Sequence, residues 1–106
     1  MALTREFKET VAARVQTDPA FARALLDEAI TLFVDGEPDS AKLVLRDLVN
    51  ATVGFEALAE EIHKPAKSLH RMLSASGNPT MSNISAVFAA VKRALGVEVR
   101  AQVVAA

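Results

Sequence analysis

The chain has no cysteine, tryptophan or tyrosine, and only four of its 106 residues are glycine. Without cysteine it can form neither a disulfide nor a thiolate zinc site, which suits a reducing compartment. So few glycines leave no glycine-rich loop of the kind that surrounds a nucleotide phosphate. No stretch approaches the roughly 20 apolar residues of a membrane span, and the first residues lack the apolar run of a secretory signal. We therefore expect a soluble, cytoplasmic protein.

Helix-forming residues dominate the amino-acid composition. Hydrophobic residues make up 51% of the chain, and the segments rich in alanine and leucine favour helix. A chain of this length is expected to form a single domain, 1–106, with one core. We predict an all-α fold, in which 1–36 form N-terminal helices and 38–96 a helix-turn-helix core. Residues 97–104 are predicted to form a short C-terminal β-strand.

The first three helices are predicted from caps and apolar spacing. Thr4 can cap a first helix that ends near Gln16. Asp18 and Pro19 then form an N-cap followed by proline at the first helical position, and Gly36 ends this second helix. A third helix starts at Pro38 and ends before Gly54. The positions expected to face inward are Phe7, Val11, Val15, Phe21, Leu25, Leu26, Leu32, Phe33, Leu45, Leu48 and Val49.

Two short helices follow, separated by a proline. A fourth helix is predicted over about Phe55–His63, and Pro65, which cannot sit cheaply in a helix interior, starts a fifth that ends near Ser74. At 100° per residue each helix has one apolar side. These sides carry Phe55, Leu58, Ala59 and Ile62 in the fourth helix and Leu69, Met72 and Leu73 in the fifth. The opposite side of the fifth helix carries Lys67, His70, Arg71 and Ser74.

The spacing of apolar residues changes near the end of the chain. After a turn at 76–79, Thr80 is expected to cap a sixth helix that Gly96 ends. Its inward positions are Ile84, Val87, Phe88, Val91 and Leu95. Beyond it, valine and alanine alternate with polar residues over Val97–Val103, as in a half-buried strand. A lone strand in a helical chain needs a partner for its backbone, so it is expected either to fray or to pair with the same strand of a second subunit.

Positive charge is concentrated in one segment. The whole chain has a formal charge of −1, yet no acidic residue occurs from Ile62 through Val97. This segment contains five cationic residues, Lys64, Lys67, Arg71, Lys92 and Arg93. Nucleic-acid backbones respond to such local positive charge and not to the average over a protein. The alternative interpretation is that the cations of the fifth helix form an ordinary solvated face.

Two short helices with a tight break can form a helix-turn-helix, whose second helix enters the major groove of DNA. Arginine there can donate two hydrogen bonds to guanine O6 and N7. The turn before the sixth helix presents donors suited to a phosphate. The predicted DNA-contacting residues are Lys64, Lys67, Ser68, His70, Arg71, Ser74, Asn78 and Thr80.

Catalysis and metal binding are not expected. The two histidines, His63 and His70, stand seven residues apart in a chain that has no cysteine, and no ladder of carboxylates accompanies them, so they make a poor zinc set. The sequence offers no pairing of a nucleophile with a base. We therefore predict no catalytic residue, no cofactor and no metal.

The sequence from Leu45 to Val99 resembles the HigA-like addiction-module antidote (antitoxin) family, whose members have a Cro/C1-type helix-turn-helix. The resemblance extends more weakly upstream, through the Asp-Pro helix start and the connection at 35–38. Three positions depart from the family pattern: His63 stands where a glycine is common, Lys64 where an apolar residue commonly follows it, and His70 where a tyrosine is frequent. The matching segments are Leu58-Ala59, Lys67-Ser68-Leu69, Leu73-Ser74, Gly77-Asn78-Pro79-Thr80 and Ala94-Leu95-Gly96.

The resemblance implies a sequence-specific transcriptional regulator that binds double-stranded operator DNA as a homodimer. With a RelE/HigB-like ribonuclease toxin as partner, such an antitoxin represses its own operon. Carried over to this chain, Lys67, His70 and Arg71 would be the recognition-helix contacts, and Asn78 and Thr80 the loop contacts.

Two other functions remain open from the sequence. One is a protein-interaction module that neutralises a toxin without significant DNA binding. Its acidic N-terminal helices would bind a basic partner through Asp27, Glu28, Asp35, Glu37 and Asp39. The other is a stand-alone prophage-type repressor that has no toxin.

Overall fold

The computed structural model describes residues 2–106, with side chains described at Phe7 and from Glu9 onward. In this part of the chain all regular structure is helical. The helices are α1 (Ala2–Thr17), α2 (Pro19–Val34), α3 (Pro38–Ala51), α4 (Phe55–Ile62), α5 (Ala66–Met72) and α6 (Met81–Leu95). The prediction of an all-α fold is confirmed, and none of these helices has both the length and the apolar character to cross a membrane.

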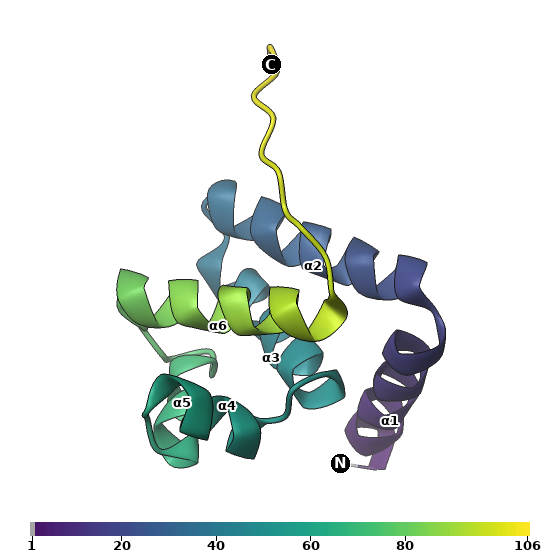
Figure 1. Ribbon diagram of the computed structural model, residues 1–106, viewed down its shortest axis with the longest axis vertical. Coiled ribbons are helices and arrows are strands. Elements are labelled where there is room, and N and C mark those ends of the chain that lie inside the picture. Colours follow the sequence, from purple (N-terminus) through teal and green to yellow (C-terminus); the bar gives the residue numbers. More distant parts are fainter. Residues whose placement is uncertain (1) are drawn as a thin grey trace.

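One hydrophobic cluster joins all of these helices. In Figure 1, α3 lies in the middle of the bundle, with α2 above it, α4 and α5 below it and α6 across the front. Side chains from each helix meet in the interior, and the largest that are fully buried are Leu45, Leu48, Val49, Leu58, Leu69, Leu73, Val87 and Val91. Burial of a leucine of this kind stabilises a fold by about 1.5–3 kcal/mol.

The predicted start and end signals of α2 and α6 are confirmed. The Asp18 side chain accepts a hydrogen bond from the Phe21 amide at 3.2 Å, and Thr80 Oγ1 accepts one from the Asn83 amide at 3.1 Å. Gly36 and Gly96 both follow the ends of their helices with positive φ, 83° and 65°. These are the N-cap and C-terminal geometries that the sequence signals favour.

Three expectations about the N-terminal half are wrong. The first helix begins at Ala2, so Thr4 lies within it and is not its N-cap. Phe7 is 60% exposed, because the packed part of α1 begins one turn later, at the buried Val11. Phe33 is 45% exposed. It rests edge-to-face on Phe88 of α6, with ring centroids 6.0 Å apart, and only one side of its ring is covered.

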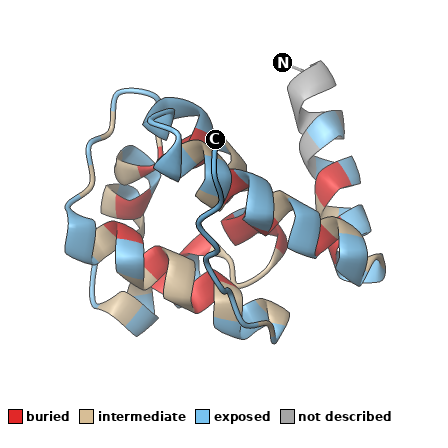
Figure 2. Cartoon of the chain, turned by 90° about the horizontal axis from the view of Figure 1, so that it is seen from above, coloured by how far each residue is buried: buried red, intermediate tan, exposed pale blue. Residues whose placement is uncertain are grey.

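The predicted C-terminal strand is absent from the single chain. Beyond Gly96, residues 97–106 have no regular structure. Figure 1 shows them leaving the bundle as an extended segment, and Figure 2 colours most of this segment as exposed. The amide of Val97 bonds to the Lys92 carbonyl and closes the end of α6. From residue 98 onward the described chain offers the backbone no hydrogen-bond partner. An alternation of apolar and polar residues leads to a strand only where a neighbouring strand supplies hydrogen-bond partners for the backbone.

Candidate nucleic-acid interface

The break between α4 and α5 is made by two residues with special backbone conformations. His63 has φ 58° and ψ 45°, a left-handed conformation that glycine adopts most easily and that a non-glycine residue rarely takes. Pro65 is extended, with ψ 142°, and stands immediately before the first turn of α5. The chain therefore turns sharply at His63 and restarts at Pro65, which makes both helices slightly shorter than predicted.

Apolar side chains hold α5 against α4. Leu69 and Leu73 are completely buried, as is Leu58 on α4, and Ile62 and Met72 are partly buried against the same cluster. The predicted inward side of the fifth helix is thereby confirmed. Because α5 has its apolar side fixed in this way, the residues half a turn away face solvent.

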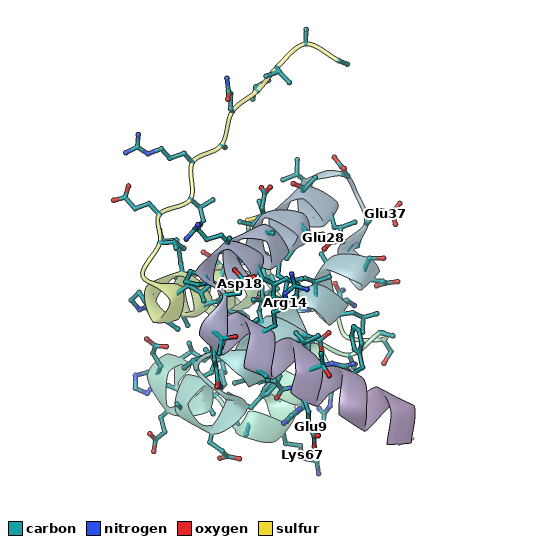
Figure 3. The ribbon with its side chains drawn as sticks, turned by 90° about the vertical axis from the view of Figure 1, so that its right-hand side faces the viewer. Glu9, Arg14, Asp18, Glu28, Glu37 and Lys67 are labelled. Carbon is teal, nitrogen blue, oxygen red and sulfur yellow. The ribbon has the colours of Figure 1, made fainter. Side chains whose placement is uncertain are left out.

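The two cations predicted on the opposite side, and Lys64 in the turn before α5, are exposed and unpaired. Lys64, Lys67 and Arg71 are all exposed. None of the three forms an ion pair or hydrogen bond with the described residues. In Figure 3, Lys67 lies at the lower edge of the molecule, away from the acidic Glu28 and Glu37 in the upper half. These three side chains, hereafter the α5 cations, are available to a ligand.

One of the other two cations of the acid-free segment is already neutralised within the protein. Arg93, near the end of α6, pairs with Glu61 near the end of α4, with Nη2 2.5 Å from Oε1. The glutamate thus neutralises Arg93, although it lies outside the acid-free segment in the sequence. Sequence alone could not reveal this pair, because the two residues are 32 positions apart.

Three of the predicted contact residues are engaged within the protein. The His70 ring is exposed but stacks on the Phe55 ring, with centroids 3.9 Å apart and planes inclined by 17°. Ser74 Oγ donates to the Arg71 carbonyl at 2.7 Å. Thr80 Oγ1 caps α6. These contacts fix local structure. Stacking covers one face of the His70 ring, and Ser74 already donates its hydroxyl proton within the protein.

The remaining predicted contacts are Ser68 and Asn78. Ser68 is partly buried on the first turn of α5, and Asn78 is exposed on the loop that leads to α6. Neither side chain has a hydrogen-bond partner in the described chain. Their amide and hydroxyl groups are therefore available, in the same region of the fold as the α5 cations.

A buried lysine fixes the loop between α5 and α6. Lys42 of α3 is only 7% exposed, and its Nζ donates to the carbonyls of Ala75, at 3.2 Å, and Gly77, at 2.5 Å. The same Nζ lies 3.1 Å from Oδ1 of Asp39. All three ammonium protons thus have acceptors, which is what a buried lysine requires.

Gly77 is essential to the same loop for a steric reason. A Cβ at this position would lie 2.1 Å from the Arg71 carbonyl oxygen and 2.4 Å from that of Met72. Only glycine allows the loop to pass so close to the end of α5. Lys42 and Gly77 together determine where Asn78 and the start of α6 lie relative to the α5 cations.

Lys42 was missed as a site residue from the sequence, although a signal was present. It stands three residues before the buried Leu45 and seven before the buried Val49, on the inward side of α3. A lysine on an apolar side needs acceptors nearby. Its acceptors are main-chain carbonyls 33 and 35 residues away, which no side-chain pattern predicts.

No three His, Asp or Glu side chains among the described residues are grouped so that they could hold a metal ion. The geometry instead offers a short outward helix with unpaired cations, next to a fixed loop with an exposed amide. Comparison of the chain with protein-family models, with curated proteins and with solved structures finds no match.

Proposed function

We propose that this protein is a sequence-specific DNA-binding transcriptional regulator that binds its operator as a dimer. The observation that carries the proposal is the position of the α5 cations. Lys64, Lys67 and Arg71 face solvent without partners, while Leu69 and Leu73 anchor the opposite side of the same short segment. A helix held in this way by a preceding short helix suits insertion into the major groove.

Each residue would have a distinct part in that complex. Arg71 would bind guanine O6 and N7 with two parallel hydrogen bonds, which discriminate between bases. Lys67 would reach a base or a phosphate, and Lys64, in the turn, a phosphate. Asn78 and the free amides at the start of α6 would bind a second phosphate. Phosphate contacts of this kind set the position of a recognition helix on the duplex.

A single copy of α5 can read only a few base pairs. Specific binding therefore needs a second copy on a half-site one helical turn away, roughly 34 Å. The net charge of −1 gives the protein as a whole no general attraction to DNA. Two local cationic surfaces on one duplex would supply the attraction that the average charge lacks.

The antitoxin part of the proposal is supported by the acidic end of α2 and the connection to α3. Asp27, Glu28, Asp35 and Glu37 are exposed and have no partner among the described residues. Asp39 differs, because it pairs with Lys42. A basic partner such as a RelE/HigB-like ribonuclease would find complementary charge here, away from the α5 cations (Figure 3). Co-purification with the protein encoded beside this one tests this part separately from DNA binding.

Lys64 provides a test of the DNA proposal through salt dependence. If Lys64 contacts a phosphate, Lys64→Ala removes one counterion-releasing contact from each subunit. Per subunit, the slope of log K against log salt should then flatten by about one unit. The preference for one sequence over another should not change. Fluorescence anisotropy with a labelled duplex, titrated at several salt concentrations, measures both quantities.

The matched control is Arg93→Gln, which removes a cation from the same acid-free segment. Because Glu61 already neutralises Arg93, this variant should change the slope less than Lys64→Ala does. Equal slopes for the wild type and Lys64→Ala would remove Lys64 from the interface.

A further inference from the structure

The C-terminal segment and α2 border an unfilled groove. Its volume is about 570 Å³, and it is lined on one side by α2, from Arg23 to Val34, and on the other by Val97–Val103. Ile30 and Val34 supply apolar surface from the helix, and Val34 is largely exposed. Val97 packs against the core, whereas Val99 is 41% exposed. Val103 is 97% exposed, so the apolar side of the segment becomes progressively more exposed along its length, beside an open space.

The backbone along this segment has no partner. Residues 98–106 form no main-chain hydrogen bonds within the described chain. Apolar side chains alternate with Glu98, Arg100 and Gln102, so an extended backbone places all three polar residues on one face. An unpaired extended segment with such an alternation is a template for another strand. The groove beside it offers the space into which such a strand would fit.

We infer that the strand that fills this groove is the same segment of a second copy of the chain, paired antiparallel and centred on Val99. In this register Val99 lies opposite Val99 of the other copy. Glu98 lies opposite Arg100 and Arg100 opposite Glu98, because directly opposed residues in a two-fold antiparallel pair share a face. The ribbon has its valine side towards the α2 helices and its charged side towards solvent.

Charge selects this register over the neighbouring ones. If the pair were centred on Arg100, the two copies of Arg100 would face each other. In a parallel in-register pair, Glu98 would face Glu98 and Arg100 would face Arg100. Like charges placed directly opposite each other are destabilising. Centring on Ala101 opposes Arg100 to Gln102 and gains no ion pair. Only the register centred on Val99 gives two cross-strand Glu–Arg pairs. The same two side chains already approach within 3.4 Å along one strand, so the four charges would form an alternating group.

The absence of native cysteine makes a cross-linking test direct. Four full-length variants, Val99→Cys, Arg100→Cys, Ala101→Cys and Gln102→Cys, are oxidised under identical mild conditions. A disulfide needs Cα atoms about 4.4–6.8 Å apart, and only residue 99 meets its own copy in the inferred register. Val99→Cys should form a covalent dimer roughly tenfold faster than the other three variants. A maximum at any other position, or equal slow rates at all four, overturns the inference.

Charge exchange gives an independent measurement without oxidation. Glu98→Arg places two pairs of like charges across the ribbon, and Arg100→Glu does the same. Each should weaken dimerisation by roughly tenfold in sedimentation equilibrium. The double exchange, Glu98→Arg with Arg100→Glu, restores opposite charges and should restore the dimer. Both side chains are highly exposed, so the fold of the single chain is not at risk. A double variant as weak as the single ones contradicts the register.

These measurements need no DNA. A covalent Val99→Cys dimer that binds no operator would retain this inference and reject the proposed function. A protein that binds operator specifically but forms no dimer through this segment would reject this inference and retain the proposed function.

Discussion

Replacement of Arg71 by alanine is expected to weaken operator binding by about 1–3 kcal/mol for each half-site, a factor of roughly 5 to 150. The guanidinium is exposed and has no partner within the described protein, so its removal costs little folding free energy. The loss should appear in binding alone. Electrophoretic mobility shift with a duplex selected from a random pool gives the affinity, and thermal unfolding confirms that stability is unchanged.

Arg71→Lys is the matched variant that separates base reading from charge. Lysine keeps the positive charge but cannot reproduce the planar pair of donors. Binding to unrelated duplexes should therefore stay near the wild-type level, while preference for guanine at one position should fall. If Arg71→Ala binds the selected duplex as tightly as the wild type, Arg71 does not read a base, and the assignment of α5 as a recognition helix loses its main support.

Replacement of Lys42 by methionine is expected to lower the free energy of unfolding by about 2–4 kcal/mol. The carbonyls of Ala75 and Gly77 lose a charged donor, and such hydrogen bonds contribute about 1.5–3 kcal/mol each. Methionine fills a similar volume and removes the desolvation cost of the buried ammonium, which offsets part of that loss. The loop would also lose its fixed position. Operator affinity should therefore fall even at temperatures where the variant is folded. Denaturant unfolding and anisotropy measure the two effects.

Asp39→Asn is the control for this prediction. Asp39 pairs with the same Nζ, but its side chain is 77% exposed, against 7% for Lys42. An exposed partner contributes little, so its removal should cost less than about 1 kcal/mol. An equally large loss in both variants would mean that the ion pair, and not the two carbonyl hydrogen bonds, holds the loop.

Local signals in the sequence predicted most of the helical framework. Asp18 and Thr80 both act as N-caps, and Gly36 and Gly96 both end helices, because these interactions involve neighbours in the chain. The apolar spacing also identified Leu58, Leu69 and Leu73 as buried. Side chains at fixed helical intervals share a face whatever the rest of the fold does.

Contacts between distant segments explain what the sequence did not predict. Phe7 has a helical spacing that suits the core, yet no other helix covers it. Arg93 is neutralised by Glu61, and Lys42 reaches carbonyls beyond α5, both across more than 30 residues. The alternation after Gly96 predicted a strand, but a strand requires a second backbone that a single chain does not supply here. Each of these outcomes depends on where a helix or a second chain lies, and not on the local pattern.

The site itself was partly predictable. The exposure of Lys67 and Arg71 follows from a helix with one apolar side, and Lys64 is exposed in the turn before it. The stacking of His70 on Phe55 could not be predicted, because it depends on the angle between α4 and α5. That angle is set by the left-handed conformation of His63, which a histidine rarely adopts.

The most direct test of the account is to map the DNA-contacting surface residue by residue. Uniformly ¹⁵N-labelled protein is titrated with the selected duplex, and amide chemical shifts are followed by NMR. We expect the largest changes at 64–71 and at 77–80, with α1 and α2 nearly unaffected. Changes confined to α1 and α2, with the amides of α5 unmoved at saturating duplex, would contradict it.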